Sequence, residues 1–355
     1  MNRTRVLIVD DSALMRELLS EILSRDPGIE VVGTAPDPFR AREKIGRLHP
    51  DVLTLDVEMP GMDGLTFLEQ LMRAHPMPVL MVSSLTAKDC DVTLRALELG
   101  AIDYVTKPHL DIESGTLEQA DEIIAKVKMA GGARVRRRER PSQPGAEPKG
   151  NTALSPPSSS LGFKATHKVI AVGASTGGTE ALVQFLTPLP ADCPGIVIVQ
   201  HMPAGFTHSF AARLDSLCHV RVKEAQNGDT VLPGHALLAP GNFQMEVARN
   251  GVQTVAKVFA GEPVNRHRPS VDVLFQSCAQ ALGSNAVGVI LTGMGADGAR
   301  GLLAMRQAGA RTVAQDEDSC VVFGMPREAI ALGAAEEVSP LGNIAPAVLR
   351  LAADR

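Results

Sequence analysis

The sequence is poor in aromatic residues: they make up 3% of its 355 residues, with no tryptophan and one tyrosine. Proteins that bind single-stranded nucleic acid use such side chains as stacking platforms. The formal net charge is −5, whereas strong polyanion binders carry a basic excess. Together these two shortages argue against nucleic acid as a partner.

Cysteine is also scarce. There are five cysteines, an odd number, and no two of them form a C-x-x-C pair. We therefore expect reduced, buried thiols rather than a disulfide framework, and a cytoplasmic location. The apolar run that begins at residue 6 is too short for a signal peptide, and no run approaches about 20 apolar residues, so we expect no direct membrane insertion.

What the chain does have is length and apolar residues: 355 residues, 45% of them hydrophobic, are typical of two domains with substantial cores. Its composition changes over residues 131–165, which are rich in Pro, Gly, Ser and Arg. Such a segment buries too little apolar surface to offset its ordering entropy. We predict one domain over residues 1–125, a flexible linker over 126–165 and a second domain over 166–355.

Short apolar runs alternate with helical patterns in the first half of the chain. The runs are at residues 5–11, 30–35, 51–57, 78–84 and 103–108. A β-α-β-α series of this kind predicts a flavodoxin-like α/β domain, with a five-stranded parallel sheet and helices on both faces.

The second half contains continuous apolar runs at residues 168–175, 195–201 and 286–293. Uninterrupted runs are typical of strands buried on both faces, so we predict a doubly wound, mostly parallel α/β domain. Residues 235–240 and 243–258 look more like antiparallel strands, with a hairpin turn at Asn250-Gly251. These segments predict a mixed sheet.

Polar side chains stand at the ends of four strands predicted in the first half. They are Asp10, Asp11, Asp56, Ser83 and Lys107. Because parallel strands end at the same edge of a sheet, the three carboxylates would crowd together and need a cation, and oxygen ligands suit Mg²⁺. The lysine and the hydroxyl could then hold a phosphoryl group. Helix capping and turn formation would explain one such aspartate, but not this whole set.

Residues 3 to about 125 resemble a two-component response-regulator receiver domain. The resemblance is carried by VDDS at 9–12, DVEMPGMDG at 56–64, SS at 83–84 and YVTKP at 104–108. It implies that a phosphohistidine on a sensor kinase transfers its phosphate to Asp56. It also implies Mg²⁺ ligands at Asp10, Asp11, Asp56 and the backbone carbonyl of Glu58, phosphoryl contacts at Ser83 and Lys107, and an aromatic switch at Tyr104.

Three predicted strand ends in the second half carry Ser175, His201 and Asp297. If those strands are parallel neighbours, the three side chains form an activated-nucleophile constellation. We expect His201 Nε2 to take the proton of Ser175 Oγ, and His201 Nδ1–H to donate to Asp297. The backbone N–H groups of Thr176 and Met294 are candidates for an oxyanion hole.

Other interpretations of the glycine-rich turn at residues 173–178 fit less well. It is not a G-x-G-x-x-G fingerprint, no Walker lysine follows it, and the order Ser, His, Asp is not that of α/β-hydrolases. A purely structural turn leaves the other two strand ends unexplained. The chain contains no H-E-x-x-H motif, so we expect no metal in hydrolysis. Nearby, Arg266 and Arg268 could bind acidic substrate neighbours or only line a loop, and His267 has no assigned role.

Residues 166 to about 352 resemble the catalytic domain of the chemotaxis protein-glutamate methylesterases. The carriers are GASTGG, VQHM, LAPG, RHRPSVDVLF, LTGMGADG and QDEDSCVVFGMP. The two resemblances together cover the chain except the linker. The second one implies that Ser175, His201 and Asp297 are a catalytic triad on a doubly wound sheet.

The resemblance implies a phosphorylation-activated serine hydrolase. It would demethylate glutamate methyl esters and deamidate glutamines on methyl-accepting chemotaxis receptors, which gives sensory adaptation. The expected partners are these receptors and the histidine kinase of the chemotaxis pathway, and we expect a monomer without an organic cofactor. Two alternatives stay open: the same hydrolase serving a non-flagellar receptor-like array, and a response regulator with a non-catalytic binding output domain.

Overall fold

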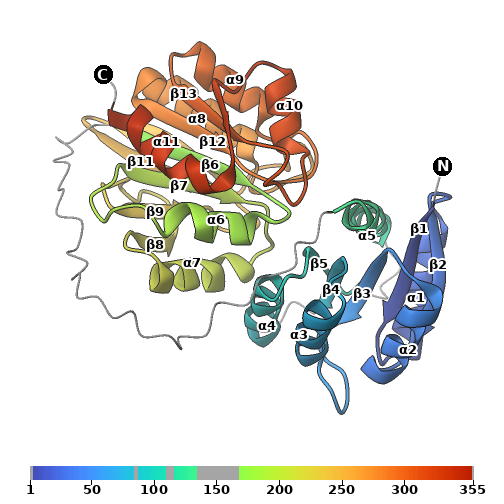
Figure 1. Cartoon of the computed structure of the whole chain (residues 1–355). Coiled ribbons are helices and arrows are strands. Elements are labelled where there is room, and N and C mark those ends of the chain that lie inside the picture. The colour runs from blue at the N-terminus through green and yellow to red at the C-terminus, as the bar shows by residue number, and fades with distance from the viewer. Residues whose placement is uncertain (1–2, 84–86, 109–115, 134–167, 354–355) are drawn as a thin grey trace, which may run out of the picture.

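Two parallel sheets, each with helices on both faces, are built from successive parts of the chain (Figure 1). The computed structural model describes residues 3–83, 87–108, 116–133 and 168–353. We call residues 3–133 the N-terminal unit and residues 168–353 the C-terminal unit. No helix in these described ranges combines the length and the apolar character that crossing a membrane requires.

The N-terminal unit contains a sheet with the strand order β2-β1-β3-β4-β5. Its strands are β1 (Thr4–Val9), β2 (Ile29–Ala35), β3 (Val52–Asp56), β4 (Val79–Ser83) and β5 (Asp103–Thr106). Its helices are α1 (Ala13–Ser24), α2 (Pro38–Leu48), α3 (Gly64–Ala74), α4 (Ala87–Glu98) and α5 (Thr116–Gly131). All neighbouring strands pair in parallel, which confirms the predicted five-stranded sheet.

Local sequence explains where several helices of the N-terminal unit begin. The side chains of Ser12, Asp37 and Asp63 each accept a hydrogen bond from a backbone N–H in the first turn of α1, α2 and α3. Such caps satisfy donors that the helix itself leaves unpaired. At the other end of the unit, α5 extends to Gly131, beyond the predicted start of the linker at residue 126. Residues 134–165 of the predicted linker lie outside the described residues.

The C-terminal unit contains a sheet with the strand order β14-β13-β12-β6-β7-β9-β8. Its strands are β6 (Val169–Ala174), β7 (Gly195–Gln200), β8 (Arg221–Glu224), β9 (His235–Leu238), β10 (Gln244–Asn250), β11 (Gln253–Phe259), β12 (Ala286–Ile290), β13 (Arg311–Gln315) and β14 (Glu337–Ser339). Its helices are α6 (Gly178–Leu186), α7 (Phe206–Leu217), α8 (Val271–Leu282), η1 (Gly283–Asn285), α9 (Ala299–Gln307), α10 (Met325–Ala331) and α11 (Leu341–Ala353).

The prediction of a mixed sheet is wrong, because β9 pairs in parallel with both β7 and β8. This four-residue strand is too short for its sequence to reveal its direction, and its last three residues are buried, as in an interior strand. The antiparallel pair is confirmed, but β10 and β11 form a separate two-stranded hairpin. Gly251, with φ of 60°, adopts the left-handed conformation that this tight turn requires.

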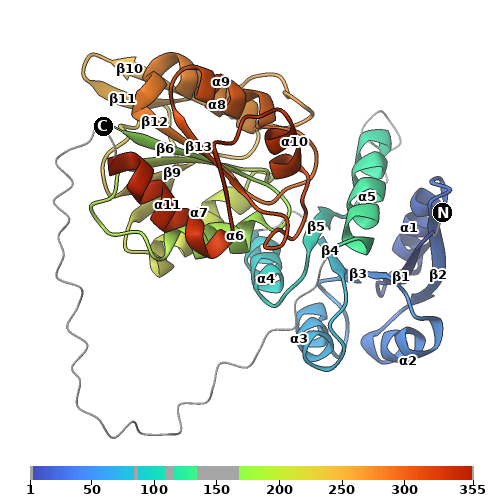
Figure 2. The same ribbon diagram turned by 45° about the horizontal axis from the view of Figure 1, so that its top comes forward.

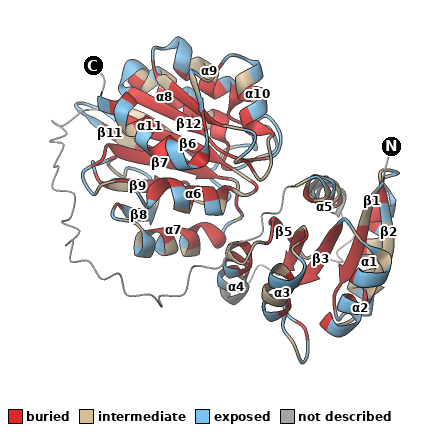
Figure 3. Ribbon diagram, viewed as in Figure 1, coloured by how far each residue is buried: buried red, intermediate tan, exposed pale blue. Residues whose placement is uncertain are grey.

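Helices α8, α9 and α10 cover one face of the larger sheet, and α6, α7 and α11 cover the other (Figure 2). The central strands β6, β7 and β12 are buried along their whole length, whereas the outward sides of the helices are exposed (Figure 3). Burial on both faces explains their uninterrupted apolar sequences. The polar side chains that chemistry needs therefore lie just beyond the strand ends.

The N-terminal unit packs against the C-terminal unit through α4, which contacts α6 and α7 (Figures 1 and 2). At this interface, the ring of Tyr104 stacks on Phe206 with 4.6 Å between ring centroids. Arg213 of α7 forms an ion pair with Glu98 of α4. Elements of the N-terminal unit therefore lie beside the edge at which β6 and β7 end.

Candidate functional site

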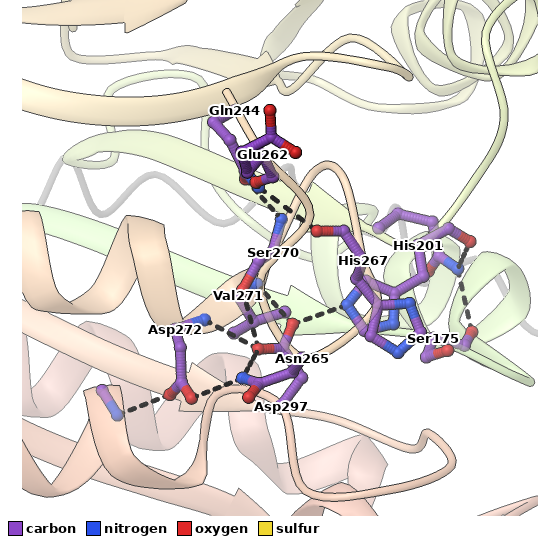
Figure 4. Close-up of polar contacts among 12 residues, drawn as sticks. Ser175, His201, Gln244, Glu262, Asn265, His267, Ser270, Val271, Asp272 and Asp297 are labelled. Carbon is purple, nitrogen blue, oxygen red and sulfur yellow. Dashed lines mark hydrogen bonds and ion pairs between the residues drawn. The ribbon is translucent and has the colours of Figure 1, made fainter. Parts of the chain in front are cut away.

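The three side chains predicted to form a triad come from neighbouring strands. Ser175 directly follows β6, His201 directly follows β7, and Asp297 lies in the loop between β12 and α9. Because β6 pairs with both β7 and β12, these ends lie at one edge of the sheet. Figure 4 shows Ser175 beside the ring of His201, and a dashed line joins that ring to Asp297.

An imidazole–carboxylate hydrogen bond joins His201 and Asp297, with 2.8 Å between His201 Nε2 and Asp297 Oδ2. The predicted nitrogens are therefore reversed. His201 Nδ1 is the nitrogen left for Ser175, since it is buried and has no hydrogen-bond partner among the residues that the structure describes. Strand order determines where the backbone of His201 lies, but the side-chain rotamer decides which ring nitrogen meets the carboxylate.

Ser175 makes no hydrogen bond to His201 in this structure, although both residues are described. Its backbone is well anchored: Ser175 N–H donates to Thr292 O at 3.0 Å, and His201 N–H donates to Ala174 O at 3.1 Å. Catalytic hydrogen bonds are often long or absent until substrate is bound.

The carboxylate of Asp297 is buried, with its side chain 1% exposed, and it accepts several further hydrogen bonds. Oδ1 accepts from Asn265 Nδ2 and Ser270 Oγ, both at 2.7 Å, and Oδ2 accepts from Val271 N–H at 2.7 Å. Burial acts to raise the pKa of Asp297, but the bonds from His201 and these donors outweigh it and hold the pKa well below its usual range. Asp297 is therefore an anion that can orient His201 and stabilise imidazolium.

Sequence reasoning missed Asn265 and Ser270 as partners of Asp297. Ser270 occupies the position before α8, where serine normally caps a helix, yet its side chain makes no capping bond and contacts Asp297 instead. The only signal in the sequence was thus an ordinary cap. Asn265 carried no local signal at all, because its contact spans 32 residues.

The two backbone N–H groups predicted to form an oxyanion hole are free. Among the described residues, neither Thr176 N–H nor Met294 N–H donates a hydrogen bond to the protein. Thr176 precedes α6, whose N-terminus adds a positive partial charge at this edge. Both groups are therefore available to a developing oxyanion.

Gln200, the last residue of β7, links the backbone of Ser175 to that of His201. Its Nε2 donates to Ser175 O at 2.9 Å and to His201 O at 3.2 Å. The side chain is buried, with the residue 3% exposed. One amide therefore holds the backbone at both triad positions.

The three residues singled out near residue 267 lie in different surroundings. The ring of His267 stacks on that of His201, with 3.7 Å between centroids and 11° between planes. Arg268 donates to Gly261 O at 2.8 Å, which supports the loop. Arg266 is exposed.

A second polar site occupies the strand ends of the N-terminal unit. One carboxylate oxygen from each of Asp10, Asp11 and Asp56 lies within 4.8 Å of the others. Lys107 Nζ is 2.8 Å from Asp56 Oδ1, and Ser83 Oγ accepts from Thr93 Oγ1 at 2.8 Å. The structure thus brings together the predicted acidic cluster and the predicted lysine.

The oxygens of this cluster suit a hard divalent cation. Asp10 Oδ2 and Asp56 Oδ2 are buried and accept no hydrogen bond from any residue that the structure describes. Burial raises the pKa of Asp56 to about 6, only partly offset by Lys107, so the anion is poorly stabilised without a further positive charge. Lys107 Nζ lies 3.9 Å from Asp10 Oδ2. Buried carboxylate oxygens that accept no hydrogen bond are typical cation ligands. Glu58 lies next to the cluster, with its N–H 3.4 Å from Asp56 Oδ1.

A direct hydrogen bond connects the two units at the catalytic edge. Thr176 Oγ1 donates to Asp103 Oδ2 of β5 at 2.5 Å, and both residues are buried. Lys126 of α5 lies 3.6 Å from Asp103 Oδ1 and donates to Tyr104 O at 2.7 Å. The residue that follows Ser175 is thus bonded to the strand that carries Tyr104.

Two family models match successive parts of the chain. A family model described as CheB methylesterase matches residues 170–348, and one described as response regulator receiver domain matches residues 6–116. The solved catalytic domain of a Thermotoga maritima CheB methylesterase is 39% identical, with a TM-score of 0.51, covering 52% of this chain and 98% of that one.

Curated relatives match along nearly the whole length. A Bordetella parapertussis protein-glutamate methylesterase/protein-glutamine glutaminase is 60% identical, over 100% of this chain and 99% of the relative. A Geobacter metallireducens protein of the same description, numbered 1, is also 60% identical, over 96% of this chain and 93% of the relative.

Proposed function

This chain belongs to the CheB methylesterase family, and from that premise we propose that it hydrolyses glutamate methyl esters, and deamidates glutamines, on methyl-accepting chemotaxis receptors. The observation that carries the proposal for the residues is the hydrogen bond between His201 and Asp297 beside Ser175. The alternative of a non-catalytic output domain is not favoured, because the full-length relatives described above are named as enzymes.

We propose that Ser175 Oγ attacks the ester carbonyl while its proton passes to His201 Nδ1. The tetrahedral oxyanion accepts from Thr176 N–H and Met294 N–H, and Asp297 stabilises the imidazolium through Nε2–H. His201 then gives the proton to the departing methoxide, which leaves as methanol. Water resolves the glutamyl ester of Ser175 by the same proton route, releasing glutamate; an amide substrate releases ammonia instead.

In the receiver, we propose that Asp56 accepts a phosphoryl group from the histidine kinase of the chemotaxis pathway. Asp10, Asp11, Asp56 and the carbonyl of Glu58 would hold Mg²⁺, which neutralises charge on the phosphoryl oxygens. Lys107, whose Nζ is 2.8 Å from Asp56 Oδ1, and Ser83 would contact those oxygens after transfer. We assign the receiver to the chain up to the end of α5 at Gly131 rather than to the predicted residue 125, the linker to the segment from there to residue 165, and the catalytic domain to residues 166–355, in a monomeric cytoplasmic protein.

We further propose that the arrangement described above is the inhibited one. The bond between Asp103 and Thr176, and the stack of Tyr104 on Phe206, hold the receiver at the catalytic edge. Phosphorylation of Asp56 would favour release, as a two-state switch requires. Deleting residues 1–160 should then raise esterase activity in the absence of a phosphodonor; unchanged or lower activity of the folded fragment would contradict inhibition.

The central experiment is covalent labelling of the chain by a serine-directed fluorophosphonate. We expect the label on Ser175, and no label in Ser175→Ala. The matched control is Ser216→Ala, which removes an exposed serine of α7 and should label normally. Methanol release from methylated receptor membranes should follow the same pattern. Methanol release at the normal rate by Ser175→Ala would refute the assignment.

A further inference from the structure

The segment that carries His267 is a tight turn with an unusual backbone. Val264 N–H donates to His267 O at 3.0 Å, and His267 N–H donates to Val264 O at 2.9 Å. The two residues between them, Asn265 and Arg266, have φ of 53° and 67°, the left-handed values of a type I′ turn. Arginine rarely adopts this conformation, so surrounding contacts must stabilise the turn.

Those contacts are directed at two members of the triad. On one side, Asn265 Nδ2 donates to Asp297 Oδ1 at 2.7 Å. On the other, the ring of His267 lies parallel to that of His201, 3.7 Å away (Figure 4). Gln244 Nε2 donates to His267 O at 3.2 Å and so fixes the backbone that carries the ring.

We propose that His267 is a positioning residue whose flat ring holds the plane of the catalytic base His201. The proposal rests on the function proposed above. Within the described part of the chain, the ring of His201 has one hydrogen bond, from Nε2 to Asp297, and its Nδ1 is without a partner. One hydrogen bond, at Nε2, does not fix the plane of the His201 ring, which could still rotate about that bond. A parallel ring against its face restricts that rotation and keeps Nδ1 directed at Ser175.

The charge state of His267 suits this role. Burial lowers its pKa to about 3, and the positive charges of Lys126 and Arg266 act in the same direction, as does His201 whenever its ring is protonated; Asp297 acts in the opposite direction. A neutral ring does not compete with His201 for the carboxylate. It also tolerates the positive charge that His201 acquires during proton transfer, and an aromatic face is attractive to such a cation.

The test compares two replacements of similar size, His267→Phe and His267→Leu. Phenylalanine keeps a flat ring against His201, whereas leucine fills the space without one. We expect His267→Leu to lower kcat for methanol release about tenfold with little change in KM, because the base is misaligned rather than the substrate lost. We expect the kcat of His267→Phe to lie much closer to that of the wild type than to that of His267→Leu. His219→Ala, which removes an exposed histidine of the same unit, is the control.

Two further measurements separate positioning from packing. Thermal unfolding of each variant measures the loss of packing. The rate at which the fluorophosphonate labels Ser175 measures how well His201 activates the serine, and this measurement needs no receptor. The proposal is overturned if Phe and Leu lower the labelling rate equally, or if neither lowers it. If the wild-type chain is labelled at Ser175 but releases no methanol, the receptor substrate is wrong, and the Phe–Leu comparison of labelling rates still decides the role of His267.

Discussion

Replacing Asp103 with alanine should release the receiver from the catalytic edge. Asp103 Oδ2 accepts the hydroxyl of Thr176 at 2.5 Å inside the interface, where both residues are buried. The replacement lies in the receiver, so it leaves every atom of the proposed catalytic site unchanged. Lys126 keeps Glu122 as an ion-pair partner at 3.2 Å, so no buried cation is left alone.

The expected magnitude follows from the type of bond that is lost. A hydrogen bond to a carboxylate contributes about 1.5–3 kcal/mol net, which corresponds to a change of about 10- to 150-fold in the docking equilibrium. As long as the released form is the minor one, activity without a phosphodonor should rise by the same factor. The rise stops when the released form dominates, so the phosphorylated rate should not change.

The assay is methanol release from methylated receptor membranes, with and without a small-molecule phosphodonor. Asp103→Asn keeps an acceptor oxygen without the charge, and should give a smaller increase than alanine. Asp121→Ala removes an exposed carboxylate of α5 and should behave as wild type. If Asp103→Ala folds normally and its unphosphorylated activity equals that of the wild type, this bond does not contribute to inhibition.

Three further predictions concern the catalytic domain. In Gly178→Ala the new Cβ would lie 2.1 Å from Gln200 Oε1. We therefore expect a lower kcat in turnover assays and a free energy of unfolding lower by about 1–3 kcal/mol in denaturant titrations. Wild-type values of both would contradict this geometry. Asp297→Asn should lower kcat by about 10⁴. Because folding lowers the pKa of Asp297, its charge stabilises the fold above the unfolded pKa of about 4. The difference in free energy of unfolding between wild type and Asp297→Asn should therefore become smaller below that pH. A difference that does not depend on pH would refute this. Burial raises the pKa of Cys278 to about 12, so iodoacetamide at pH 8 should modify the half-buried Cys218 before Cys278. Mass spectrometry of the native protein measures the order of modification, and earlier modification of Cys278 would refute this.

The positions of the triad and of the acidic cluster could be predicted because they depend on a simple rule. Parallel strands buried on both faces read as apolar runs, and the polar residue that follows each run lies at a common edge. Ser175, His201 and Asp56 all follow from that rule. The rule predicts where the backbone of each residue lies but not which rotamer its side chain adopts. For this reason it could not predict which ring nitrogen of His201 bonds to Asp297.

What could not be predicted depends on contacts between distant segments. Asn265 contacts Asp297 because a left-handed turn directs its amide there. A type I′ turn that contains arginine has no recognisable sequence pattern, so this turn could not be predicted. The direction of β9 was missed for a related reason. In so short a strand, parallel pairing is decided by the neighbours on either side rather than by its own residues.

The shared amide of Gln200 has a consequence for anyone who engineers this enzyme toward new esters. Because the side chain of Gln200 bonds the backbone at both Ser175 and His201, exchanging either the loop after β6 or the loop after β7 alone would disturb a contact that the two loops share. A graft that carries both loops together with Gln200 preserves the contact. Directed evolution of substrate scope should therefore begin at more distant segments that leave this contact intact.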